Sequence, residues 1–108
     1  MGYIMVWKLF IDDERFPANA DFIIARNSYD AIWMTKTYGM PIEIAFDHDL
    51  GGQDTSINYI SWLTRSVVDG EIEIPEGFVY SVHSQNPVGK VNIISKMDQL
   101  IKHYGDCE

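Results

Sequence analysis

The chain has 108 residues, of which 46% are hydrophobic and 22% are charged, and this length fits a single domain. The hydrophobic fraction excludes a wholly disordered chain, and no apolar run reaches the ~20 residues of a membrane-spanning helix. The first residues lack the cleavage site of a signal peptide, and the single cysteine, Cys107, cannot form an internal disulfide. We therefore expect one soluble, cytoplasmic domain over residues 1–108.

The charge balance narrows the range of partners. Sixteen acidic residues against eight Lys and Arg give a formal net charge of −8, and the basic residues are scattered singly. Proteins that bind duplex nucleic acid need a basic surface to neutralise phosphates, so we expect no duplex binding. Since no apolar run is long enough to span a membrane, we expect no membrane association either. A small phosphorylated ligand or an RNA end can still bind where a metal ion or a helix N-terminus supplies positive charge, and a protein partner stays open.

Four short hydrophobic runs predict β-strands. They cover residues 7–11, 22–26, 42–46 and 78–82, and each is bounded by charged or turn-forming residues. The segment from Asp12 to Asp21 joins the first two runs and is too short and too rich in turn residues for a full crossover helix. That connection therefore either holds one helical turn or joins the strands in another way.

Three helical patterns follow the second, third and fourth strands. The first covers about residues 29–38, with Ser28 as its N-cap. The second begins at a cap within residues 54–56, and its apolar residues recur at helical spacing. The third begins at Asn86, which precedes a proline at the first helical position, and ends at Gly105.

Strands that alternate with helices indicate a parallel sheet. The rules of handedness and connection favour the strand order 2-1-3-4. We therefore predict an α/β fold with a parallel sheet of about four strands and helices on both faces.

Polar residues collect where the first, third and fourth strands end, at Asp12 to Arg15, Asp47 to Asp49 and His83 to Asn86. The carboxyl ends of parallel strands share one edge of the sheet, where ligands bind. If the first and third strands are neighbours, the carboxylates of Asp12, Asp13 and Asp47 converge and repel one another unless a cation is present. Hard oxygen ligands of this kind suit Mg²⁺ or Mn²⁺. Taken alone, each acidic loop is better interpreted as a solvated turn, and it is their position at one edge that favours a metal site.

Histidines and anion-binding groups lie in the same loops. His83 and His48 are candidates for general base and acid at a phosphorus centre, whereas a third histidine near the end of the last helix is structural. Ser84 and Asn86 stand at a helix start whose free N–H groups can bind a phosphate. Arg15 could clamp the same anion or form a surface ion pair with a neighbouring carboxylate, Glu14 or Asp13.

The acidic pair after the first strand and the aspartate after the third resemble the receiver domains of two-component signalling. By this resemblance Asp12 and Asp13 would bind Mg²⁺, and Asp47 would accept a phosphoryl group. The chain departs from the receiver pattern at His83-Ser84, where a receiver has Ser or Thr. It also lacks the fifth strand, the lysine that follows that strand, and the last helix.

The chain more closely resembles the family of cyclic-phosphate-processing receiver domains. Three motifs carry this resemblance, from Leu9 to Pro17, from Asp47 to Gly51 and from His83 to Gly89, in order and at the strand ends. The resemblance implies a truncated receiver-like (flavodoxin-like) fold and a role in processing the cyclic phosphate ends of RNA, in repair or conflict systems.

Three hypotheses follow from these residues. The first is a small metal-dependent phosphoesterase that opens an RNA 2′,3′-cyclic phosphate or a cyclic nucleotide. The metal ligands would be Asp12, Asp13 and Asp47. The proton-transfer groups would be His83 and His48. The phosphate would be bound by Arg15, Ser84 and Asn86. The alternative is a non-catalytic module that binds a nucleotide or a partner. The third is a phosphoacceptor receiver that uses Asp47.

Overall fold

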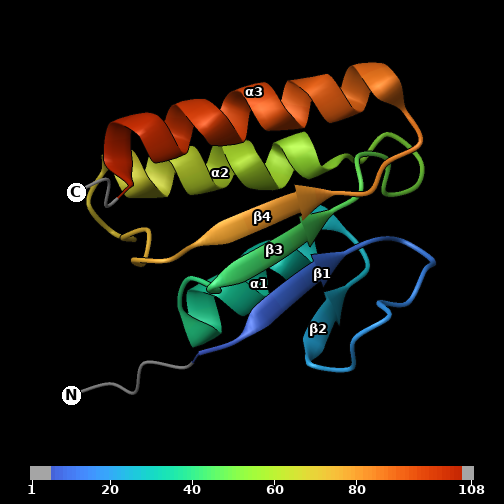
Figure 1. Cartoon of the computed structure of the whole chain (residues 1–108), viewed down its shortest axis with the longest axis horizontal. Helices are drawn as coiled ribbons and strands as arrows, with labels where there is room; N and C mark the ends of the chain where they lie inside the picture. The colour runs from blue at the N-terminus through green and yellow to red at the C-terminus, as the bar shows by residue number, and fades with distance from the viewer. Residues whose placement is uncertain (1–5, 106–108) are drawn as a thin grey trace.

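Four parallel strands form one sheet in the order β2-β1-β3-β4 (Figure 1). The computed structural model describes residues 6–105, and Cys107 lies outside this range. The strands are β1 (Lys8–Ile11), β2 (Phe22–Ala25), β3 (Glu43–Phe46) and β4 (Val79–Val82), and the helices are α1 (Ser28–Tyr38), α2 (Ser56–Val68) and α3 (Pro87–Tyr104). The predicted α/β class and the strand order 2-1-3-4 are confirmed. None of the helices within residues 6–105 has the length and apolar character needed to cross a bilayer.

All three helices pack on the same face of the sheet. α2 contacts both α1 and α3, and the three helices form one layer. The main core lies between this layer and alternate strand residues such as Leu9, Ile11, Ile44 and Phe46. On the opposite face, no helix within the described residues covers the sheet. The prediction of helices on both faces is therefore wrong.

The handedness of the connections explains the single helical layer. In the observed strand order, the connections from β2 to β3 and from β3 to β4 run in the same direction across the sheet. Right-handed crossovers that run in the same direction place their helices on the same face. Among the crossovers, only one between β1 and β2 would place a helix on the other face, and residues 12–21 contain no helix. The two strands are thus joined in parallel by an irregular segment. α3 follows the last strand and packs against α2, in the same layer.

The helix starts tie the loops at the carboxyl edge together. Asn27 caps α1 by accepting the N–H of Asp30, so the predicted cap, Ser28, is wrong by one residue. Ser28 instead donates its N–H and its hydroxyl to the carboxylate of Asp54, at 2.8 and 2.6 Å. Thr55 caps α2. Asp54 therefore connects the start of α1 to the start of α2.

Candidate functional site

A buried carboxylate lies at the centre of the site. Asp12 is fully buried at the end of β1, and its Oδ1 accepts the backbone N–H groups of Glu14 and Arg15 at 3.0 and 2.9 Å. Its Oδ2 lies 3.0 Å from Nε2 of His83. Burial alone would raise the pKa of Asp12, but these hydrogen bonds outweigh it and hold the pKa below its usual value of 3.8. The ionised carboxylate only accepts hydrogen bonds, so Nε2 of His83 carries a proton.

His83 is held through its ring and through its backbone. Its ring stacks on Phe10, with centroids 4.8 Å apart and an angle of 6° between the planes. Its backbone N–H donates to the carbonyl of Phe46 at 2.8 Å, which continues the sheet register beyond β4. The side chain keeps 27% of its surface exposed. His83 is therefore ordered and still reachable from solvent, and its Nδ1 is the nitrogen that does not face Asp12.

Three carboxylates converge beside this pair, as the sequence predicts. Asp12, Asp13 and Asp47 each place one carboxylate oxygen within 4.8 Å of the other two. Burial and the negative charge of Asp12 raise the pKa of Asp47. Three hard oxygen donors at this separation fit the preferences of Mg²⁺ or Mn²⁺. Their assignment as metal ligands stays a prediction.

A polar hollow of about 530 Å³ lies between the acidic cluster and the start of α3. Its lining is mostly polar and comprises Asp13, Glu14, Arg15, Asp47, Asp49, Ser84, Gln85, Asn86 and Pro87. Arg15 reaches across it and donates from Nη1 to the carbonyl of His83 at 3.3 Å. Among the described residues Arg15 forms no ion pair, so the predicted alternative of a surface pair with Glu14 or Asp13 is wrong.

The start of α3 offers fewer free donors than the sequence suggests. Asn86 caps the helix as predicted, and its Oδ1 accepts the N–H of Gly89 at 3.0 Å. The hydroxyl of Ser84 accepts the N–H of Asn86 at 3.0 Å, and Pro87 has no N–H. Ser84 and Asn86, two of the three predicted phosphate-binding residues, therefore already bond the local backbone, and the expected cradle of free N–H groups is reduced.

His48 belongs to a second cluster. Its Nδ1 lies 2.9 Å from Oδ1 of Asp49, and its ring packs directly against Gly89, where a Cβ would lie 2.3 Å from the Cγ of His48. Asp49 also accepts from Asn86 at 3.4 Å. No hydrogen bond joins His48 to His83 in the part of the chain that the structure describes. His48 thus connects the loop after β3 to the first turn of α3.

The sequence analysis missed one basic residue at this edge. Arg26 follows β2 and donates from Nη1 to the backbone carbonyls of Asp12 and Arg15, at 3.0 and 2.6 Å. Its guanidinium also lies over the ring of Phe16, 4.7 Å from the centroid. The feature of the sequence that could have identified Arg26 is its position directly after a strand, at the edge where the other polar residues gather. Arg26 holds the loop that carries the acidic pair.

The strand order and the acidic cluster at the carboxyl edge define a receiver-like α/β domain. The family model described as the cyclic-phosphate processing receiver domain matches residues 7–99. The chain belongs to this family, which confirms the resemblance based on the three motifs. A search of curated proteins and a search of solved structures gave no match.

Proposed function

We propose that the protein is a metal-dependent phosphoesterase that opens cyclic phosphates, either at the 2′,3′-cyclic end of an RNA or in a cyclic nucleotide. The observation that carries this proposal is the 3.0 Å contact between His83 and the buried Asp12, beside the acidic cluster and the hollow. Membership of the cyclic-phosphate processing family supports the choice of substrate.

The route of proton transfer follows from the pairing of His83 with Asp12. The carboxylate of Asp12 holds the N–H at Nε2, so Nδ1 of His83 is the nitrogen that takes a proton from the attacking water. The water oxygen forms a bond to phosphorus, one of the two ring ester bonds breaks, and the proton ends on the ribose oxygen that leaves. The product is a phosphate monoester.

The other residues bind and neutralise the phosphate. Arg15 contributes a guanidinium that can contact two phosphate oxygens at once. A divalent ion bound by Asp12, Asp13 and Asp47 would neutralise the charge that develops on the phosphate oxygens. We assign His48 a positioning role, because its ring contacts Asp49 and Gly89.

Turnover of a defined substrate tests the proposal. The protein is incubated with a nucleoside 2′,3′-cyclic phosphate and with Mg²⁺, Mn²⁺ or EDTA, and ring opening is followed by phosphorus NMR. We expect turnover with either metal and a loss of roughly 10²–10⁴-fold in His83→Ala, the usual contribution of a general base. His103→Ala, which removes an exposed histidine at the end of α3, is the matched control and should keep full activity. No turnover by the wild type with either metal would reject the proposal.

A non-catalytic nucleotide-binding module is the second candidate. It is favoured by the lining of the hollow, which includes Arg15 and the start of α3 but not His83, so that a nucleotide held there need not meet the imidazole. This candidate predicts that a nucleoside 3′-phosphate binds in calorimetry while the cyclic phosphate stays intact. Turnover that depends on His83 would exclude it.

A further inference from the structure

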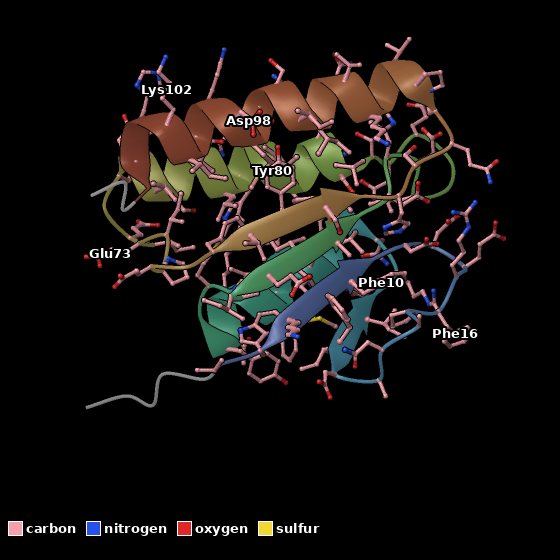
Figure 2. The ribbon with its side chains drawn as sticks, viewed as in Figure 1. Phe10, Phe16, Glu73, Tyr80, Asp98 and Lys102 are labelled. Atoms are coloured by element: carbon pink, nitrogen blue, oxygen red, sulfur yellow. The ribbon has the colours of Figure 1, made fainter. Side chains whose placement is uncertain are left out.

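The basic residues of this acidic chain gather on two helices. α2 and α3 carry four of the eight Lys and Arg residues, namely Arg65, Lys90, Lys96 and Lys102. They carry only one of the sixteen acidic residues, Asp98, and its carboxylate accepts a hydrogen bond from the hydroxyl of Tyr80 at 2.5 Å (Figure 2). The surface of α2 and α3 is therefore cationic, on a protein whose net charge is −8.

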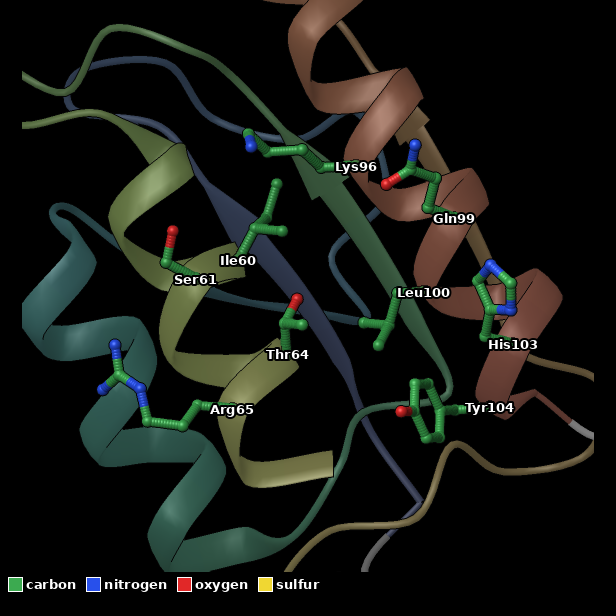
Figure 3. A pocket seen from close by; sticks show the side chains of 9 residues that line it. All are labelled: Ile60, Ser61, Thr64, Arg65, Lys96, Gln99, Leu100, His103 and Tyr104. Carbon is green, nitrogen blue, oxygen red and sulfur yellow. The ribbon is translucent and has the colours of Figure 1, made fainter. Parts of the chain in front are cut away.

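A groove of about 440 Å³ lies between these two helices (Figure 3). The buried side chains of Ile60 and Leu100 give it an apolar floor. Arg65, Lys96 and His103 also line it, and Lys96 extends from α3 toward α2. Neither Arg65 nor Lys96 forms an ion pair with a carboxylate of the described residues. The groove thus suits an acidic segment with apolar side chains exposed beside it.

An acidic segment lies on the same chain, and its Ile74 packs in the protein's own core. Residues 69–76 follow α2 and read Asp69-Gly70-Glu71-Ile72-Glu73-Ile74-Pro75-Glu76, with all four carboxylate residues exposed. Glu73 extends away from the body of the protein at the end where α3 finishes (Figure 2). Part of the segment lines a second hollow with Tyr104, and Tyr104 also lines the groove. The cationic groove and the acidic segment are therefore adjacent.

We propose that this end of the molecule is a self-association surface, at which residues 69–76 of each copy bind the α2–α3 groove of a second copy. Two adjacent patches of opposite charge satisfy a two-fold axis, because each patch then meets its complement on the other copy. Val68 and Tyr104 are 53% and 48% exposed at this end and supply an apolar centre within a charged rim. The occupant is a second copy because both complementary patches belong to this chain.

The surface lies away from the candidate functional site. α2 begins beside Asp47, whose carbonyl accepts a hydrogen bond from the hydroxyl of Ser56, and α3 begins at Asn86 in the hollow. Both helices run from that edge of the sheet to the opposite end of the molecule (Figure 1). A dimer formed there leaves the hollow open, so the inference does not depend on the proposed function.

Exchange of charge between two variants tests the interface. Sedimentation velocity on the wild type from about 1 μM to about 1 mM should show a concentration-dependent dimer, as expected for a weak to moderate affinity. Lys96→Glu and Glu73→Lys should each weaken the dimer by roughly tenfold, because each places like charges together. A mixture of the two variants should dimerise as well as the wild type, since only the mixed dimer pairs opposite charges on both sides of the axis.

Lys90→Glu is the matched control, because it makes the same change of charge on α3 at an exposed position that does not line the groove. It should leave the dissociation constant unchanged. The proposal is overturned if the wild type stays monomeric, if the mixture does not restore association, or if Lys90→Glu weakens the dimer as much as Lys96→Glu does. Salt alone is a poor test, because it also screens the repulsion between two copies that each carry −8.

Discussion

Nε2 of His83 lies 3.0 Å from Oδ2 of Asp12, although 71 positions separate the two residues in the sequence. The contact joins the end of β4 to the end of β1, two strands that flank β3 in the sheet. It orients the imidazole and also satisfies one oxygen of a fully buried carboxylate. The same bond therefore serves both the proposed chemistry and the stability of the fold.

Removal of the imidazole should destabilise the protein. In His83→Ala, Oδ2 of Asp12 loses its partner inside the protein. A buried acceptor without a partner costs about 1–3 kcal/mol, and a charged acceptor costs more. Urea unfolding at neutral pH measures the difference, with His103→Ala as a control that should leave the unfolding free energy unchanged. An unchanged midpoint in His83→Ala would mean that solvent replaces the histidine at no cost.

The loss of folding stability at acid pH should depend on Asp12. Its pKa is lowered in the folded state, so its contribution is present above the unfolded value of about 3.8 and is lost as the pH falls through the folded value. Asp12→Asn should reduce stability at neutral pH and flatten the change below pH 3.8. Unfolding free energies from about pH 2 to pH 7 measure this. Asp21→Asn, at an exposed position in the same loop, should leave the curve unchanged.

Asp47 should have the opposite effect in the absence of metal. Burial and the charge of Asp12 raise its pKa, so the folded state loses stability as the pH rises through that value. Asp47→Asn should therefore stabilise the protein at neutral pH in EDTA, because it removes a carboxylate whose ionised form the folded state disfavours. Thermal unfolding with and without Mg²⁺ provides the measurement. The wild type should gain stability from the ion and the variant should gain much less, whereas equal gains would argue against a metal site at Asp47.

A methyl group at position 89 should push His48 out of place. A Cβ at Gly89 would lie 2.3 Å from the Cγ of His48, so Gly89→Ala should cost about 1–3 kcal/mol through overpacking. In a His48→Ala background the clash disappears, and the better helix propensity of alanine should stabilise α3 by up to about 1 kcal/mol. A double-mutant cycle on the unfolding free energy tests this reversal of sign. Two additive effects would mean that the ring moves away freely.

The contact of Tyr80 with Asp98 should make the protein sensitive to alkali. Burial and the hydrogen bond to Asp98 raise the pKa of Tyr80 above its ordinary value of 10. Stability from this group is complete below pH 10 and falls as the pH rises further, because the unfolded chain ionises first. Tyr80→Phe should cost about 1 kcal/mol at neutral pH and reduce the loss above pH 10. Urea midpoints between pH 8 and pH 11 would show no such flattening if the hydroxyl were irrelevant.

The sequence predicted the position of the candidate site more reliably than its internal contacts. Parallel strands necessarily bring their carboxyl ends to one edge, so the convergence of Asp12, Asp13 and Asp47 followed from strand order alone. The hydrogen bonds at this edge did not follow. The Asn86 cap was predicted, but its consequence was not: the bonded Oδ1 no longer faces a ligand, and the hydroxyl of Ser84 turns to the N–H of Asn86. Nor did the sequence indicate that His48 bonds Asp49.

The alternation of apolar runs and helical patterns was enough to specify a parallel sheet, its strand order and the edge that carries the polar loops, because these depend on local periodicity and on chain connectivity. The crossovers that carry α1 and α2 run one way across the sheet, so the handedness rule puts both helices on one face. The face on which α3 packs was decided by tertiary structure, because α3 follows β4 and leads to no further strand in the described residues. The pairing of His83 with Asp12 also required the folded protein, since distance in space between residues so far apart in the chain depends on the assembled sheet and on the packing of its loops.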